Sequence, residues 1–282
     1  MKKINRGKTL FFAVFLCAVA ASGWSQESRQ QTGQMNLTVA GSGVNLAITR
    51  LLAEAFMQEQ PQVVFTVPGS IGTQGAIAAT VDGAIHLGLI SRPLKDEEKS
   101  LGIVAKPYAR VAMVIGAHPA VQDIGITSEE LIAILKGVKT RWHDGNEIIV
   151  QIREKFDSGM QILGKAIPGF NEAYWESLEA KRWSVSFTDQ DANQALSTTP
   201  YAIGVTDFGM VVTERLNIKV LAFNGVLPTR DTLENGSYPL ARQLAFIYRQ
   251  GKLSEEAAAF LKFVASDAGR KILQAYNYVP ME

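Results

Sequence analysis

The stretch Leu37–Gly43, LTVAGSG, is typical of a buried strand that ends in small residues just before a helix, because helical spacing follows over 44–58. The same order of strand, small residues and helix returns at 69–73, GSIGT, and at 157–160, DSGM. A helix start has unpaired backbone N–H groups and the positive end of the helix dipole, so it favours an anion. Each start is therefore a candidate anion site, and Thr73 is placed to be both helix cap and hydroxyl donor. A single glycine turn is equally well a plain tight connection.

Apolar runs typical of strands alternate with helical patterns along the chain. Such alternation predicts an α/β fold in which mainly parallel sheets are covered by helices on both faces. Parallel units place their helix starts at the same carboxyl edge of a sheet, where open α/β folds bind ligands. The predicted strands are 63–67, 85–90, 110–116, 147–152, 201–205 and 218–223, and the predicted helices are 44–58, 73–82, 128–136, 158–165, 189–197, 254–265 and 266–275.

The first 25 residues have the pattern of a secretory signal peptide. Lys2, Lys3, Arg6 and Lys8 precede the apolar run Leu10–Ala21, and small residues follow it. This run is shorter than the roughly 20 apolar residues of a membrane anchor. We therefore expect cleavage, a periplasmic location and no stable membrane insertion.

The only cysteine, Cys17, lies within the predicted signal peptide, so no disulfide and no cysteine metal site are expected in the mature protein. Cleavage removes 4 of the 28 Lys and Arg and leaves all 27 Asp and Glu, which makes the net charge −3. This charge does not favour broad attraction to nucleic acid or to an anionic membrane. An anion would have to be bound by local groups. No cofactor is expected, and no His, Cys, Asp and Glu cluster has metal-ligand spacing.

The alternating pattern pauses twice, at 116–127 and at 224–236, in Gly, Pro and polar residues. These pauses predict two crossings between lobes, with both chain ends in one lobe. On this interpretation 26–116 and 224–282 form the first lobe and 117–223 the second.

The third helix start combines several groups suited to an anion. Asp157 is placed to cap its own helix, which would leave Ser158 and the backbone amides of Gly159 and Met160 facing outward. Arg153 ends the preceding strand, and its planar guanidinium suits an oxyanion. A lone arginine at a strand end is more often a surface salt-bridge partner, but beside an anion-ready helix start we favour the binding role.

These segments resemble the phosphate-binding proteins of bacterial ABC importers, which are periplasmic two-lobed binding proteins. The likeness covers nearly the whole mature chain, and the combination NGV.PT with G.YPL.R is fairly specific to the group. It implies two α/β lobes that close over a phosphate, an ABC permease as partner and no catalysis. We also expect a monomer. The resembling segments are LTVAGSG, GSIGTQGAIAATVDGAIHLGLISRPL, ITSEELIAILKGVKTRWHDGN, VQIREKFDSGM and FNGVLPTRDTLENGSYPLAR.

The resemblance implies roles for particular residues. Asn45 and Leu46 stand where family members supply a hydroxyl and a backbone N–H, and Thr73 stands where a serine hydroxyl is expected. The segment 153–160 matches the family's R…SGT pattern. The expected ligand-binding residues are Ser42, Asn45, Leu46, Thr73, Ser91, Arg153, Ser158, Gly159 and Met160.

Three departures from the family pattern affect this interpretation. Met160 replaces the usual threonine, the spacing from Arg153 to the serine is one residue longer, and Ser91 stands where the family has an aspartate. A carboxylate accepts a hydrogen bond from a protonated oxyanion and repels an unprotonated one, so its loss weakens selection of phosphate over sulfate. Phosphate remains the expected ligand, and sulfate, molybdate and tungstate are the alternatives. We expect Arg153→Ala to weaken oxyanion binding more than Ser42→Ala.

Other function classes are less well supported by the sequence. A serine hydrolase would use Ser42, Ser70 or Ser158, all at sharp turns, but none of the three histidines stands near a nucleophile motif. A phosphate-sensing or scavenging module without a transporter shares every feature of an importer's binding protein. The sequence does not separate these last two.

Overall fold

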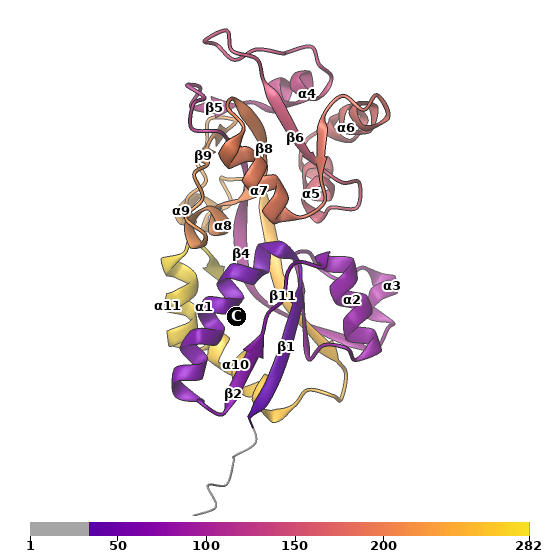
Figure 1. Ribbon diagram of the computed structural model, residues 1–282, viewed down its shortest axis with the longest axis vertical. Helices are drawn as coiled ribbons and strands as arrows, with labels where there is room; N and C mark the ends of the chain where they lie inside the picture. The colour runs from indigo at the N-terminus through magenta and orange to yellow at the C-terminus, as the bar shows by residue number, and fades with distance from the viewer. Residues whose placement is uncertain (1–33, 282) are drawn as a thin grey trace, which may run out of the picture. The chain divides into compact units, whose positions relative to one another are not determined.

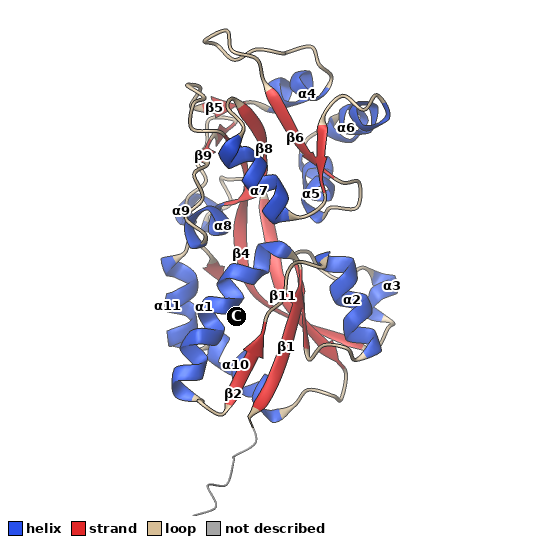
Figure 2. Ribbon diagram, in the orientation of Figure 1, coloured by secondary structure: helices blue, strands red, loops and turns tan. Residues whose placement is uncertain are grey.

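The computed structural model describes residues 34–281, and the predicted signal peptide lies outside them. Strands and helices alternate along most of the chain (Figure 1), and in Figure 2 α1 and α11 lie on one side of β1, with α2 and α3 on the other. The strands are β1 (Met35–Gly41), β2 (Val63–Thr66), β3 (Leu87–Ile90), β4 (Ile103–Ala117), β5 (Gly125–Ile126), β6 (Ile149–Arg153), β7 (Ser184–Ser186), β8 (Ala202–Asp207), β9 (Lys219–Val220), β10 (Ala222–Phe223), β11 (Ala241–Arg249) and β12 (Val279–Pro280). The helices are α1 (Gly43–Glu59), α2 (Gly72–Asp82), α3 (Asp96–Lys99), α4 (Ser128–Leu135), α5 (Ser158–Ala166), α6 (Phe170–Glu179), α7 (Asp189–Thr198), α8 (Phe208–Thr213), α9 (Arg230–Glu234), α10 (Glu255–Ala265) and α11 (Asp267–Ala275). None of the described helices is long and apolar enough to span a membrane.

The sheet is parallel at both ends and antiparallel in the middle. Its main strand order is β2-β1-β3-β11-β4-β8-β6-β7. β1 runs parallel to β2 and β3, and β6 runs parallel to β7 and β8, as predicted for α/β units. β4 and β11 are antiparallel to each other and to their outer neighbours. The two α/β parts are therefore joined through the two long central strands.

The sequence patterns predicted only part of β4 and missed β11. β4 contains Pro107, which has no N–H to donate and interrupts the apolar pattern. The register of β11 against β4 shifts between Leu244 and Ala245, and Ala245 lies opposite Pro107. A bulge of this kind admits a proline into a sheet. The predicted strand 218–223 is also split, into β9 and β10.

Two large apolar clusters fill the described part of the chain. One joins α1, α10 and α11 to β1 and β11, with Phe56, Phe246 and Phe260 at its centre. The other is formed mostly by residues between Ala112 and Phe223, and Tyr238 and Leu240 also pack in it. The predicted lobe boundaries stay predictions, and from this packing we propose that the return crossing lies nearer 240 than 224.

Candidate functional site

Three hydroxyl groups meet at the carboxyl ends of β1 and β3 and the start of α2. Ser42 Oγ donates a hydrogen bond to Ser91 Oγ at 2.9 Å, and Thr73 Oγ1 lies 3.3 Å from the same atom. The close approach depends on Gly41, whose φ is +154°, because a Cβ there would collide with the carbonyl of Leu89. The backbone N–H of Ser42 donates to that carbonyl at 2.9 Å. Strand order and one glycine thus place the hydroxyls together.

Ser158 joins this group from the second α/β part of the sheet. It is the first residue of α5, and its Oγ lies 2.9 Å from Ser91 Oγ. Ser42, Ser91 and Ser158 are all buried. We call Ser42, Thr73, Ser91 and Ser158 the hydroxyl cluster.

Arg242 on β11 lies against the hydroxyl cluster and was not predicted as a site residue. Its Nη1 donates to Ser158 Oγ at 3.1 Å and to Ser91 Oγ at 3.4 Å, and only 2% of the residue is exposed. Its Nε lies 3.1 Å from Asp207 Oδ1 in a buried ion pair. The arginine stands in the segment SYPLAR that carried part of the resemblance, but the missed strand gave no reason to direct it toward the site.

A cavity of about 430 Å³ adjoins the hydroxyl cluster. Among the residues predicted to bind a ligand, four line it: Ser42, Thr73, Arg153 and Ser158. Ser91 does not line it but is hydrogen-bonded to three of these four, Ser42, Thr73 and Ser158. The full lining is Ser42, Ser70, Ile71, Gly72, Thr73, Gln74, Arg92, Arg153, Glu154, Phe156, Asp157, Ser158, Phe187, Thr188 and Asp189.

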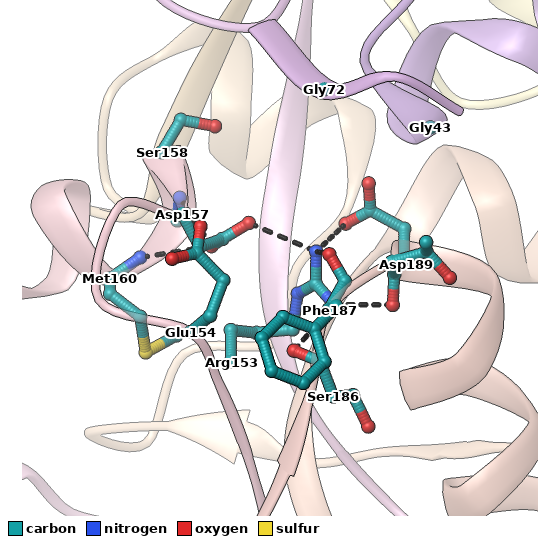
Figure 3. Close-up of polar contacts among 12 residues, drawn as sticks. Gly43, Gly72, Arg153, Glu154, Asp157, Ser158, Met160, Ser186, Phe187 and Asp189 are labelled. Atoms are coloured by element: carbon teal, nitrogen blue, oxygen red, sulfur yellow. Dashed lines mark hydrogen bonds and ion pairs between the residues drawn. The ribbon is translucent and has the colours of Figure 1, made fainter. Parts of the chain in front are cut away.

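The guanidinium of Arg153 is held by groups around it. Nη1 donates to the carbonyls of Ser186 and Thr188, and Nη2 donates to the carbonyl of Phe187 and to Asp157 Oδ2 at 3.2 Å. Figure 3 shows the carboxylates of Asp157 and Asp189 directed at this guanidinium, with Asp189 Oδ1 3.7 Å from Nη2. Both terminal nitrogens of Arg153 are thus engaged, so the arginine's main contacts are with its own protein.

The amides at the start of α5 do not face outward as predicted. Asp157 Oδ1 accepts from the N–H of Gly159 at 2.8 Å and from the N–H of Met160 at 3.2 Å. An aspartate at the N-cap supplies the acceptor that these free amides need, so its carboxylate takes the place predicted for the anion. The side chain of Met160 is buried in the second apolar cluster.

At the other two helix starts, Asn45 and Leu46 lie away from the cavity, and the prediction that Thr73 caps its helix is wrong. Asn45 is buried, its amide nitrogen donates to the carbonyl of Ile90 at 3.4 Å, and its Oδ1 accepts from the Tyr108 hydroxyl at 2.7 Å. Leu46 packs in the first apolar cluster, and neither residue lines the cavity. Thr73 does not cap α2, because the helix begins at Gly72 with no side-chain cap; its hydroxyl instead accepts from the N–H of Ser91 at 3.3 Å.

Two carboxyl groups were not predicted: Asp189, which lines the cavity and is partly buried, and Asp207, which is buried and pairs with Arg242. Asp189, at the start of α7, packs against Gly43 so closely that a Cβ at position 43 would lie 2.6 Å from its Oδ2. Burial raises the pKa of Asp189, and the charge of Asp157 raises it further. Burial also raises the pKa of Asp207 to about 7, although Arg242 acts to lower it. The raised pKa values favour the protonated carboxyls, and Asp189 lines the cavity beside its hydroxyl groups.

No group of His, Cys, Asp and Glu within residues 34–281 is arranged to hold a metal ion. The arrangement instead combines hydroxyl donors, a buried guanidinium and acceptor carboxylates around one cavity. These groups can form hydrogen bonds to an oxyanion and, through the carboxylates, to a proton that the oxyanion carries.

The chain is similar to several known proteins, some of which are named phosphate-binding proteins. It is 25% identical to the phosphate-binding protein PstS of Bacillus subtilis over 300 residues, which cover 100% of this chain and 95% of that protein. It is 28% identical to the protein SphX of Synechococcus elongatus over 299 residues, covering 94% and 83% of the two chains.

Solved structures share the fold. A phosphate ABC transporter substrate-binding protein from Clostridium perfringens, solved with bound phosphate, gives a TM-score of 0.77 at 22% identity and covers 88% of this chain and 100% of that one. The regulatory domain of Synechocystis CcmR, solved in complex with 2-PG, gives a TM-score of 0.52 at 16% identity. The family described as PBP superfamily domain matches residues 26–268, which is most of the chain, and the protein therefore belongs to that superfamily.

Proposed function

We propose that this protein captures a tetrahedral oxyanion, phosphate first, and delivers it to an ABC permease. The observation that carries the proposal is the hydroxyl cluster, in which groups from both α/β parts of the sheet meet against Arg242. The names of the similar proteins PstS and of the Clostridium perfringens substrate-binding protein support the same ligand and the same kind of partner. We expect the protein to act as a monomer outside the cytoplasm.

The hydroxyl cluster would bind the anion by turning its hydroxyl hydrogens from their present acceptors toward the anion. Ser91 and Ser158 accept from Arg242, so their own hydroxyl hydrogens are left for other acceptors. An oxyanion in the cavity would compete with the present serine–serine bonds for the hydrogens of Ser42 and Ser158 and for that of Thr73. Hydrogen bonds to a charged group contribute roughly 1.5 to 3 kcal/mol each, so three of them with a buried guanidinium behind them support micromolar or tighter binding.

The cavity carboxylates would favour an oxyanion that carries a proton. Ser91 has no charge, but Asp157 and Asp189 line the same cavity and are acceptors in their ionised forms. They would accept a hydrogen bond from a protonated phosphate and repel sulfate. We therefore rank phosphate above sulfate, molybdate and tungstate.

Binding without chemistry is supported by the contacts of the histidines. His86 Nδ1 accepts from the N–H of Thr38, His118 Nδ1 accepts from the N–H of Ala120, and His143 pairs with Asp123. None of these contacts orients an imidazole toward Ser42 or Ser158, as a serine hydrolase would require.

Calorimetric titration of the purified protein with phosphate, sulfate, molybdate and tungstate tests the ligand. Phosphate should bind most tightly. Asp189→Asn should reduce the ratio of phosphate affinity to sulfate affinity about tenfold, because it removes a carboxylate that repels sulfate when ionised. Asp191→Asn is the matched control, because Asp191 is exposed on the same helix. Absence of binding by all four anions would contradict the proposed function. Uptake measured with and without the permease separates an importer's binding protein from a sensing or scavenging module.

A further inference from the structure

The cavity is larger than an inorganic oxyanion needs, even though the groups around it are in contact. Ser91 and Ser158 touch at 2.9 Å, and Gln190 Nε2 reaches the carbonyl of Gly43 at 3.4 Å, so the two sides of the cavity already meet at two points. The remaining volume is about 430 Å³. A tetrahedral anion of five heavy atoms fills roughly two to three water volumes, about 60 to 90 Å³. Most of the cavity is left for something else.

The rest of the cavity wall includes an apolar rim formed by Ile71, Phe156 and Phe187. Their exposed fractions are 45%, 66% and 74%, which is high for large apolar side chains in a soluble fold. All three line the cavity, Ile71 just before α2 and the two phenylalanines from the turns after β6 and β7. The cavity lining thus combines hydroxyls and Arg153 with three large apolar side chains.

The backbone of both phenylalanines is hydrogen-bonded to polar groups around the site. The carbonyl of Phe187 accepts from Arg153 at 3.2 Å, and Figure 3 shows the two residues together. The N–H of Phe156 donates to Glu154 at 2.7 Å, and its carbonyl accepts from Gln161 at 3.2 Å. The backbone of both residues is therefore held beside the anion-binding groups, so little further backbone entropy is lost on binding.

The apolar surface continues outward from the rim. Phe156 and Phe187 also line a second hollow of about 590 Å³, together with Trp175, Leu178 and Val185. Trp175 and Val185 are exposed as well. The charged residues Glu154, Lys155 and Glu179 complete the lining of this second hollow, so a ligand body that extends outward meets aromatic and aliphatic side chains with charged groups among them.

We propose that the site accepts phosphate monoesters with a planar or apolar organic group, the phosphate on the hydroxyl cluster and the organic group on the apolar rim. This inference rests on the proposed function, because it assumes that the hydroxyl cluster binds the phosphoryl end. Polar and apolar side chains together in the lining of a single cavity are typical of sites for small organic ligands. Aromatic rings on such a ligand would stack on Phe187 or Phe156.

Calorimetry with three probes tests this inference: inorganic phosphate, methyl phosphate and phenyl phosphate. The wild-type protein should bind phenyl phosphate about tenfold more tightly than methyl phosphate, the size of one good aromatic contact. In Phe187→Ala the affinities for the two esters should lie within about twofold of each other, and the affinity for inorganic phosphate should stay within about twofold of the wild-type value. Phe187→Trp should restore the preference, and Leu227→Ala, an exposed apolar residue outside both hollows, is the matched control.

Each other result overturns the inference. Equal affinity of the wild type for the two esters, or a preference that Phe187→Ala leaves intact, would show that the rim does not contact the ligand. Binding of inorganic phosphate with exclusion of both esters would contradict the inference and leave the proposed function standing. Failure of all three probes to bind would contradict both the proposed function and this inference. Thermal melts of the variants check that each is folded.

Discussion

Arg153 and Arg242 are both buried arginines near one cavity, and their partners differ. Arg242 touches serine hydroxyls, which can donate onward, and is balanced by one carboxylate, Asp207. Arg153 donates to three backbone carbonyls and to the carboxylate of Asp157, so both of its terminal nitrogens already have acceptors within the protein. The comparison shows that an arginine's place at a strand end does not decide its role; the acceptors folded around it do. Arg242 is the better candidate for stabilising a bound anion.

The largest expected effect follows from Arg242→Ala. The change removes the charge behind the hydroxyl cluster and leaves Asp207 buried without its partner, so phosphate affinity should fall about a hundredfold or more and the free energy of unfolding by about 3 to 5 kcal/mol. Calorimetry and chemical denaturation measure the two losses. Arg242→Lys keeps the charge and should retain part of the affinity in a folded protein. Unchanged affinity in a folded alanine variant would remove Arg242 from the site.

The contrast between the arginines also shows what the sequence can predict. Ser42, Thr73, Ser91 and Ser158 follow strands of parallel units or begin their helices, and the rule that parallel units share one edge brings them together. The α/β fold follows from the same alternation of strands and helices. Local patterns and topology were sufficient for this part of the site.

Arg242 and Asp189 could not be found in this way. Arg242 enters through β11, whose pairing with β4 depends on a bulge opposite Pro107 that no local pattern specifies. Asp189 reaches Arg153 only because β7 pairs with β6. Asp157 was predicted as a cap, and in the structure its carboxylate accepts from the amides of Gly159 and Met160 that were predicted to bind an anion. Residues that depend on long-range pairing need the structure.

Ser158→Ala should have the next largest effect, on the Arg242 side of the comparison. It removes one hydroxyl that bridges Arg242 and Ser91, so phosphate affinity should fall about tenfold. Ser158→Thr keeps the hydroxyl and is the control. A double-mutant cycle with Ser91→Ala measures whether the hydroxyls act together; strictly additive losses would show that they do not share one ligand.

Arg153→Ala should weaken phosphate binding less than Arg242→Ala, by about fivefold. Its guanidinium holds the carbonyls of Ser186, Phe187 and Thr188, so its loss should chiefly loosen that turn and reduce the free energy of unfolding by about 2 to 4 kcal/mol. Paired calorimetry and denaturation of both alanine variants check the order. If Arg153→Ala lost more phosphate affinity than Arg242→Ala and kept its stability, the sequence-based expectation that the Arg153 guanidinium binds the anion would be restored.

Asp207→Asn should change phosphate affinity least near neutral pH, because burial raises the pKa of Asp207 to about 7 and the wild-type carboxyl is then about half protonated. Its pKa in the unfolded chain is about 4. The folded state thus binds the proton more tightly, so this group's contribution to stability is fully present below about pH 4 and is lost as pH rises through about 7. Asp189, Asp157, Arg242 and Arg153 act on the same carboxyl, and all are kept in the variant. Denaturation of wild type and Asp207→Asn between pH 4 and 8 should show the wild type losing stability relative to the variant as pH rises. A difference that does not change with pH would show that Asp207 stays ionised throughout and that Arg242 is balanced by a full charge.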